Sequence, residues 1–280
     1  MIKACDLRDL VTGLRAAGIR PGQDLLVHSS LRQVGPVRGG AADVLEALRI
    51  ATEGATIVVP THTAANSLSS RAFLAATAGM STAQRARHVA AMPGFDPERT
   101  PSHGMGVLAE YVRTVAGAKR SSHPQTSFAA FGPRAERCTT GHQLDCHLGE
   151  SSPLGWLYQA GGAVLLLGVG YAACTALHLA EYRLPRRRSR GYRCFIATGG
   201  TRQRREFTDA DLIDSDFEAV GRLVDQEPFV RHGQVGGASC RLFPMRDIVD
   251  FAVTCGAFCR YRAGEFQTNC ATLPGRADHE

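Results

Sequence analysis

The stretch from residue 165 to residue 182, LLLGVGYAACTALHLAEY, indicates both the fold class and the place of a site. It begins as an apolar run typical of a buried strand, and then turns at two glycines. The next segment carries Thr175, His178 and Glu181 at spacings of three. On a helix, these spacings place a hydroxyl, an imidazole and a carboxylate on one stripe. A polar stripe just after a strand and a glycine turn is a usual place for a site in an α/β protein.

Upstream of this stretch, the order of elements predicts a βαβ unit. Residues 6–18 have the periodicity of an amphipathic helix, and residues 25–27 form a short apolar strand. A helix over 41–50 and a second strand over 56–59 follow. Parallel strands need such a helical crossover. We therefore expect an α/β fold with a central mixed, largely parallel sheet flanked by helices.

The remaining segments are expected to add a helical insertion and a β-rich C-terminal part. Residues 62–95 are polar and rich in alanine, which favours helix and loop outside the sheet. Downstream we expect a hairpin (192–198 and 204–207), a helix (209–227), a strand (235–243) and a closing helix (245–259). Residues 1–263 are thus predicted to form a single domain, and the polar residues 264–280 a disordered tail.

Length and composition are those of one large soluble globular domain. The chain has 280 residues, of which 44% are hydrophobic and 21% charged, enough for a sizeable core. Its longest apolar runs, such as 163–169, are far shorter than the roughly 20 residues of a membrane span. The N-terminus, MIKACDLRDL, lacks the apolar segment of a signal peptide. We expect a cytoplasmic protein with no membrane partner.

Nine cysteines are present, and none forms a CxxC pair. Cys255 and Cys259 are four residues apart, but no paired His/Cys knuckle follows them. This pattern favours reduced, mostly buried thiols over a zinc site, and we expect no metal.

The formal net charge is +6, and much of the excess lies in residues 183–193, RLPRRRSRGYR. This run has three interpretations: a solvated loop, a surface that binds nucleic acid or another polyanion, and a region that attracts the phosphates of a cofactor. Aromatic residues are sparse within it and no nucleic-acid motif accompanies it. A solvated loop is therefore favoured, and no nucleic-acid partner is expected.

The residues HSSL, 28–31, follow the first strand and also have two interpretations. Serine commonly caps helices, so the motif can be purely structural. Alternatively, backbone N–H groups at a helix start can hold an anion or a pantetheine arm. Gly104 and Gly106, at the start of another expected helix, would also permit close approach of a ligand.

Several blocks taken together resemble the antibiotic N-acetyltransferase family, whose best-known members are the aminoglycoside 3-N-acetyltransferases. They span nearly the whole chain: LLVHSSLRQVGPVRGG (25–40), DPERTPSHGMGVLAEYVRT (96–114), SSHPQTSFAAFGP (121–133), HLGESSPLGWLY (147–158), VLLLGVGYAACTALHLAEYR (164–183) and GQVGGASCRLF (233–243). The family has its own α/β fold, distinct from the GNAT acetyltransferases. The chain agrees with this in lacking the GNAT loop [QR]xxGx[GA]. A Ser–His–Glu hydrolase is disfavoured because no GxSxG elbow is present.

The resemblance implies transfer of an acetyl group from acetyl-CoA to an amine of an aminoglycoside, most often the 3-amine, with antibiotic resistance as the result. The amine must lose a proton before it attacks the thioester, and histidine is the usual base. We expect His178 to be that base, Glu181 to orient it, and Thr175 to donate to the oxyanion. His147 and Glu150 are second candidates for the base, and His123 is a third.

Direct transfer within a ternary complex needs no acyl-enzyme, although Cys174 keeps a covalent route open. The same resemblance assigns further residues to the two substrates. The CoA cleft would be lined by His28, Ser29, Ser30, Leu31, Val34, Ser102, Gly104, Met105, Gly106, His123 and Ser127. The acceptor would contact Asp145, His147, Glu150 and Tyr171.

Two departures from the family pattern concern the acceptor. Family members usually carry an Asp-Asn type pair in the turn after LLLGVG, whereas this turn is Tyr171–Cys174, YAAC. A net charge of +6 also opposes the approach of a polycationic antibiotic. An alternative acceptor is therefore a smaller, less cationic aminocyclitol such as kasugamycin, acetylated at its 2′-amine. The protein itself is expected to be a monomer or a homodimer.

Overall fold

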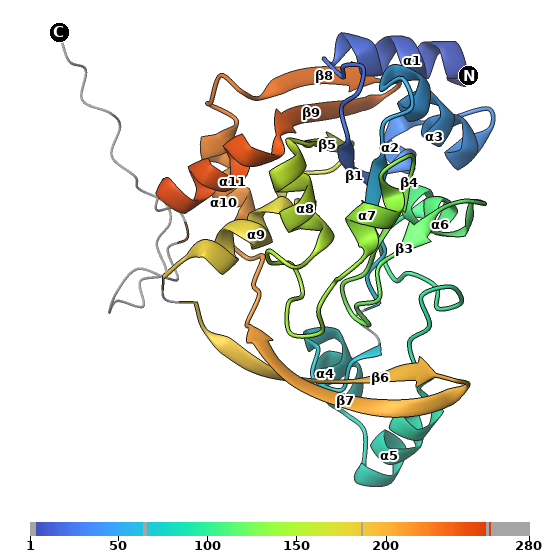
Figure 1. Cartoon of the computed structure of the whole chain (residues 1–280), viewed down its shortest axis with the longest axis vertical. Coiled ribbons are helices and arrows are strands. Elements are labelled where there is room, and N and C mark those ends of the chain that lie inside the picture. Colours follow the sequence, from blue (N-terminus) through green and yellow to red (C-terminus); the bar gives the residue numbers. More distant parts are fainter. Residues whose placement is uncertain (1–3, 64–65, 186, 256–257, 259–280) are drawn as a thin grey trace, which may run out of the picture.

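A computed structural model describes residues 4–63, 66–185, 187–255 and 258. Its centre is a seven-stranded sheet with the order β3-β4-β2-β1-β5-β9-β8 (Figure 1). The strands are β1 (Leu25–Ser29), β2 (Ile57–Pro60), β3 (Lys119–Arg120), β4 (Phe128–Phe131), β5 (Ala163–Leu167), β8 (Arg231–Val235) and β9 (Ala238–Pro244). Strand β1 pairs in parallel with both β2 and β5. The carboxyl ends of β1 and β5 therefore lie side by side, with Ser29 opposite Leu167.

The α/β class and the mixed sheet are confirmed, but the sheet is less parallel than predicted. Parallel pairing is confined to the three central strands, while β4, β3, β9 and β8 pair antiparallel to their neighbours. The strand predicted over 235–243 is present as β9, but it begins at Ala238 instead of Val235. Val235 ends β8, and a turn at Gly236 and Gly237 leads into β9, because Gly236 takes a positive φ of 57° that glycine tolerates.

Helices cover both faces of the sheet. Helices α1 (Leu7–Ala16), α3 (Gly40–Ala51) and α6 (Val107–Thr114) pack on one face, and α7 (Ala135–Thr139), α8 (Pro153–Ala160), α9 (Ala176–Arg183), α10 (Phe217–Val224) and α11 (Met245–Thr254) pack on the other. Alternate residues of each strand serve the two faces: Leu165 contacts the first helix layer and Leu166 the second. Burial on both faces explains why the central strands are continuously apolar.

A second unit lies beside the sheet. Strands β6 (Ser189–Thr198) and β7 (Thr201–Ala210) form a long hairpin around Gly199 and Gly200, and helices α4 (Arg71–Thr77) and α5 (Thr82–Ala91) pack against it (Figure 1). Single bridges join Ser67 to Cys194 and Phe95 to Ile196. The predicted helical insertion over 62–95 and the hairpin are both confirmed, and each is now seen to need the other for burial. Leu68, Phe73, Met92 and Phe195 form a small core between them.

Two further predictions were wrong. The run 183–193 is not one solvated loop: Arg183 ends α9, and residues from 189 onward form β6, paired residue by residue with β7. The helix expected over 209–227 is confined to α10, because Asp209 and Ala210 still pair with β6. The closing helix α11 ends at Thr254, and the tail 264–280 lies outside the described residues. None of the described helices is long and apolar enough to cross a membrane.

Candidate functional site

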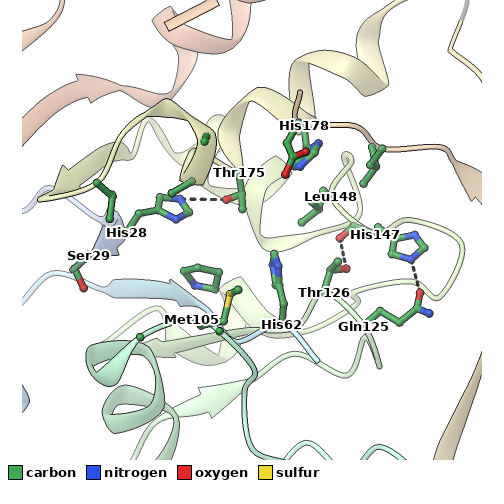
Figure 2. Close-up of a pocket in the computed structure, with 18 of the residues that line it drawn as sticks. His28, Ser29, His62, Met105, Gln125, Thr126, His147, Leu148, Thr175 and His178 are labelled. Carbon is green, nitrogen blue, oxygen red and sulfur yellow. Dashed lines mark hydrogen bonds between the residues drawn. The ribbon is translucent and has the colours of Figure 1, made fainter. Parts of the chain in front are cut away.

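A cavity of about 760 Å³ opens where the ends of β1 and β5 meet the start of α9, with β6 and the insertion forming its far wall. Figure 2 shows His28, Ser29 and Met105 on one side of the cavity, His147 and Gln125 on the other, and His178 above. Ten of the residues predicted for a site line it: His28, Ser29, Ser30, Leu31, Gly104, Met105, Gly106, His147, Thr175 and His178. Segments that are far apart in the sequence thus meet at this cavity.

His178 and Glu181 are joined by a hydrogen bond on α9. The Nδ1–H of His178 donates to Oε2 of Glu181, three residues further along the helix. Glu181 is fully buried, and its Oε1 lies 3.5 Å from the backbone N of Ile213. The imidazole ring of His178 also packs against the ring of Phe217, and the two ring centroids are 4.6 Å apart. Because Nδ1 is engaged and His178 lines the cavity, Nε2 is the nitrogen available for proton transfer.

Thr175 and His28 lie together at the floor of the cavity. The Oγ1 of Thr175, the residue that precedes α9, shares a hydrogen bond of 3.2 Å with Nε2 of His28 at the end of β1 (Figure 2). Burial, with a smaller contribution from His178, lowers the pKa of His28 to about 3. The ring of His28 is therefore neutral at physiological pH. It is suited to hold the Thr175 hydroxyl but not to accept a proton from a substrate.

On the side of Ser29 and Met105, the cavity is lined by small residues at two helix starts. Ser30 precedes the short helix α2 (Leu31–Val34) and makes no side-chain cap bond. Gly104 and Gly106 have positive φ values of 73° and 86°. A Cβ on Gly104 would contact nothing within 4 Å, so that backbone faces open space. This side of the cavity can accept an extended ligand lying against the main chain.

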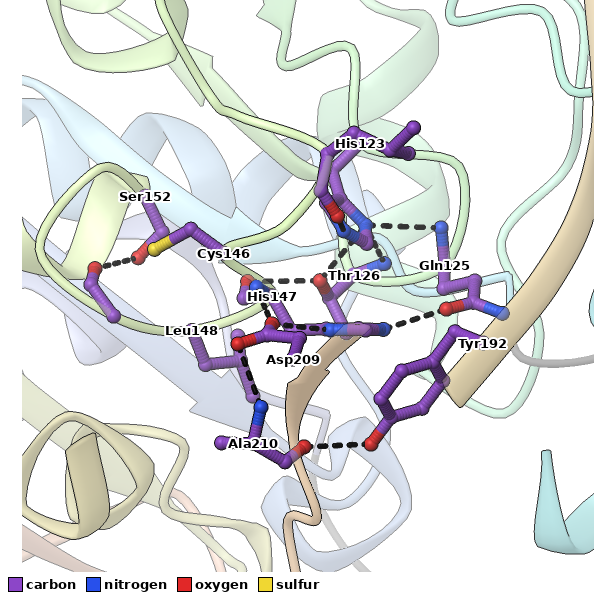
Figure 3. Close-up of polar contacts among 12 residues, drawn as sticks. His123, Gln125, Thr126, Cys146, His147, Leu148, Ser152, Tyr192, Asp209 and Ala210 are labelled. Carbon is purple, nitrogen blue, oxygen red and sulfur yellow. Dashed lines mark hydrogen bonds and ion pairs between the residues drawn. The ribbon is translucent and has the colours of Figure 1, made fainter. Parts of the chain in front are cut away.

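A second histidine, His147, is held by residues from three segments (Figure 3). Its Nδ1 and its backbone N both lie 2.6 Å from Oδ2 of Asp209, at the end of β7, and its Nε2 contacts Gln125. The hydroxyl of Tyr182 also donates to Asp209. Burial opposes the charge on Asp209, but the hydrogen bonds from His147 and Tyr182 outweigh it and hold the pKa of Asp209 below its usual value. With both ring nitrogens engaged, His147 is better placed as a wall residue than as the base.

Besides the buried Glu181, seven residues assigned from the sequence do not line this cavity. Val34 is buried in the core, since its side chain points away from the strand end into the α3 layer. The others are engaged elsewhere or exposed: Ser102 bonds Glu110, Ser127 bonds Thr61, His123 bonds Thr126 and the carbonyl of Leu144, Glu150 pairs with Arg183, the hydroxyl of Tyr171 donates to Asp225, and Asp145 is exposed.

Other lining residues were missed. They are His62, Arg71, Gln125, Thr126, Arg190, Tyr192 and Asp214, among others. Arg190 belongs to the run that was interpreted as a solvated loop. It lies in a strand two residues before Tyr192, so both side chains are on the same face, and this alternation could have indicated a strand that lines the cavity. No neighbouring residue in the sequence indicated a role for Asp209, because the folding of the β6–β7 hairpin is what brings it to His147.

Cys174 does not support a covalent route. Its side chain is completely buried, and burial raises the pKa of the thiol to about 12. A thiol in that environment is protonated and is not a nucleophile. It also does not line the cavity.

Comparison with known proteins identifies the family. The family described as Aminoglycoside 3-N-acetyltransferase matches residues 26–255. The aminoglycoside N(3′)-acetyltransferase-like protein YokD of Bacillus subtilis is 36% identical over 247 residues, covering 88% of this chain and 90% of its own length. Aminoglycoside N(3)-acetyltransferase III of Salmonella sp is 34% identical over 263 residues, covering 88% and 89%.

Solved structures agree. The crystal structure of YokD has a TM-score of 0.82 at 33% identity, covering 90% of this chain and 93% of its own. AAC-IIIb, solved as a binary complex with CoASH, has a TM-score of 0.79 at 29% identity, covering 90% and 96%. A histidine-to-alanine mutant of AAC(3)-IVa in complex with a gentamicin has a TM-score of 0.74 at 31% identity, covering 91% and 90%. The chain belongs to the aminoglycoside 3-N-acetyltransferase family.

Proposed function

We propose that the protein transfers the acetyl group of acetyl-CoA to an amine of an aminoglycoside antibiotic, directly and within a ternary complex. The observation that carries this proposal is the His178–Glu181 pair facing the cavity. Nε2 of His178 accepts the proton that the amine nitrogen loses as this nitrogen attacks the thioester carbonyl carbon. The C–S bond then breaks, and the His178 imidazolium returns that proton to the departing CoA thiolate. The buried carboxylate of Glu181 orients the ring and stabilises the imidazolium that forms.

Thr175 is the proposed donor to the tetrahedral oxyanion. If the neutral ring of His28 donates its Nε2–H to Oγ1, the Thr175 hydroxyl hydrogen is free to point into the cavity. A hydroxyl held in this way is preorganised for the charge that develops in the transition state. The hydrogen bond therefore supports a role for both residues in one donor.

Acetyl-CoA fits the side of the cavity lined by Ser29, Ser30 and Gly104–Gly106. Its pantetheine amides would pair with backbone groups at the end of β1, and the open face of Gly104 leaves room for the arm. The relative solved with CoASH supports this co-substrate. The thioester would then lie between this floor and His178.

Two classes of antibiotic are candidates for the acceptor of the acetyl group. The family and the relative solved with a gentamicin support an aminoglycoside acetylated at its 3-amine, which would confer resistance. A smaller, less cationic aminocyclitol such as kasugamycin is the second candidate. It is favoured by the turn after β5, where Ala172 and Ala173 line the cavity with methyl groups. A higher kcat/KM for gentamicin than for kasugamycin would exclude the second candidate.

Calorimetry and one variant test the proposed chemistry. We expect CoA to bind the wild-type protein, and His178→Ala to lower kcat by about 10²–10⁴-fold while leaving CoA affinity unchanged. The exposed His232, replaced by alanine, serves as the matched control and should retain full activity. Absence of CoA binding at high micromolar concentration, or full activity in His178→Ala, would refute the mechanism.

A further inference from the structure

Four of the histidines that the structure describes line the cavity, and His62 differs from the other three. His28, His147 and His178 each share a side-chain hydrogen bond with another residue of the protein. The Nε2 of His62 is buried and has no hydrogen-bond partner among the described residues. A buried polar atom without a partner destabilises the folded chain, so native proteins keep few of them. A molecule bound in the cavity can supply the missing partner.

The backbone of His62 is tied to the segment proposed to hold the CoA arm. His62 lies two residues after β2, and its carbonyl oxygen accepts a hydrogen bond of 2.8 Å from the backbone N–H of His103, which precedes Gly104. The imidazole packs edge-on against Phe128, with ring centroids 5.4 Å apart. Figure 2 shows the ring pointing into the cavity from the side that carries Met105. These contacts hold His62 on the CoA side of the cavity.

The ring of His62 also lies near the proposed base. Burial is the first cause that lowers the pKa of His62 to about 3, and His178 and His28 are the next two. Electrostatic contributions of this kind weaken with distance, so they come from neighbouring groups. In Figure 2 the ring points toward the part of the cavity between Thr175 and His178. The thioester is proposed to lie between the CoA floor and His178, which is where the ring of His62 points.

A neutral imidazole in this place is suited to donate a hydrogen bond and not to accept a proton. With a pKa of about 3, the ring of His62 carries a single N–H at physiological pH and does not compete with His178 for the proton of the amine. A neutral imidazole can polarise a substrate carbonyl through one N–H. Rotation about the Cβ–Cγ bond of histidine is soft, so Nε2 can turn toward a ligand that fills the cavity.

We infer that His62 is a second donor to the acetyl group: its neutral imidazole donates the Nε2–H to the thioester carbonyl oxygen of acetyl-CoA, and this bond strengthens as the oxygen becomes the tetrahedral oxyanion. Thr175, the donor proposed above, would approach the same oxygen from the start of α9. The proton of His62 stays on the ring throughout, and no covalent bond to this residue forms or breaks. The inference rests on the proposed acetyl transfer, but the donor can be tested by binding alone, without an acceptor.

Calorimetry with two unreactive analogues of acetyl-CoA tests the donor. Acetyl-carba(dethia)-CoA keeps the carbonyl oxygen in place but has a methylene group instead of the thioester sulfur. S-ethyl-CoA keeps the sulfur but has a methylene group instead of the carbonyl. We expect the wild-type protein to bind the ketone about tenfold more tightly than S-ethyl-CoA, which corresponds to roughly two neutral hydrogen bonds. Equal binding of the two analogues would overturn the inference.

Variants at His62 separate its contribution from that of Thr175. His62→Leu removes the donor and should reduce the preference for the ketone to about threefold or less, whereas His62→Gln keeps an N–H group and should retain most of it. His232→Leu, at an exposed position of β8 that does not line the cavity, is the matched control and should keep the full preference. Thermal melting checks that each variant is folded. An unchanged preference in folded His62→Leu, or its loss in folded His62→Gln, would refute the donor.

Kinetics distinguishes a donor from a base. With gentamicin or kasugamycin, whichever the wild type acetylates, His62→Leu should lower kcat by about 10²–10³-fold, the usual loss for one oxyanion donor. The midpoint of the pH dependence of kcat should stay where it is in the wild type, because His178 remains the base. A shifted midpoint would make His62 a base and overturn the inference. Failure of the wild type to bind CoA would instead refute the proposed acetyl transfer.

Discussion

In the proposed mechanism His178 and Glu181 act as one unit, because the carboxylate is completely buried and is hydrogen-bonded to the imidazole on the same helix. We predict that Glu181→Gln lowers kcat by about 10–100-fold while the KM for acetyl-CoA stays within about threefold. The amide keeps the size of the side chain but loses the charge that stabilises the imidazolium. Steady-state kinetics measures both constants.

The matched control for this variant is Glu150→Gln. Glu150 pairs with Arg183 on the surface and does not line the cavity. Its replacement should leave kcat unchanged. Equal losses in the two variants would mean that Glu181 acts only through stability, and an unchanged kcat in Glu181→Gln would remove it from the mechanism.

At the same scale, the sequence predicts a residue's role only where the chemistry is local. The spacing of Thr175, His178 and Glu181 sufficed to place them on one side of α9 and its preceding turn. The bond between His147 and Asp209 joins positions 62 residues apart, and it depends on where the hairpin folds. Val34 shows the converse error: a motif block was assigned to a cleft as a whole, although alternate positions of it face the core.

The hairpin β6–β7 and the insertion form one structural element, because neither buries its apolar face alone. They meet at Gly94, where an added Cβ would lie 2.7 Å from the backbone N of Ala197 and 2.8 Å from the carbonyl carbon of Ile196. We predict that Gly94→Ala forces the two segments apart and costs about 1–3 kcal/mol, a drop of several degrees in Tm. Proteolysis within residues 62–95 should become faster, as mass spectrometry of the fragments will record.

Gly79→Ala is the control for that variant. Gly79 lies between α4 and α5, and a Cβ there would meet no atom within 4 Å. Its Tm and its proteolysis should match those of the wild type. If Gly94→Ala behaves in the same way, the contact between the insertion and the hairpin contributes nothing to stability.

These elements also show why the arrangement of the sheet was only partly predictable. The βαβ pattern of β1, α3 and β2 is local, and the parallel pairing that it predicts is present. Antiparallel pairing of β4 with β2 and of β9 with β5 depends on long connections whose direction no periodicity encodes. The arginine-rich run was interpreted as a loop because its high charge is untypical of a buried strand. The strand β6 is buried through Phe195, whose apolar partners Phe73 and Met92 are distant in the sequence.

On the scale of the whole molecule, the body beneath the cavity holds an unusual set of buried neutral histidines. Burial is the largest cause that lowers the pKa of His28 and of His62 to about 3, and of His142 to about 4, with added repulsion from neighbouring histidines at His28 and His62. His123 is shifted in the same direction for the same first reason. Each ring must take up a proton if the chain unfolds in mild acid. Folding stability is therefore coupled to pH through these residues.

The stability of the protein should consequently fall as the pH is lowered from about 6.5 towards 3. In this window the unfolded chain binds protons that the folded histidines exclude; above 6.5 neither state does, and below 3 both do. His62 is the best position for the test, because its buried Nε2 has no hydrogen-bond partner in the described part of the chain, so its replacement breaks no bond at that atom. We predict that His62→Gln reduces the slope of unfolding free energy against pH by up to about 1.4 kcal/mol per pH unit. Urea unfolding at pH 7, 6, 5 and 4 measures the slope.

The control is His103→Gln, at an exposed position, which should leave the slope of unfolding free energy against pH unchanged. A slope in His62→Gln equal to that of the wild type would show that His62 is protonated in the folded protein.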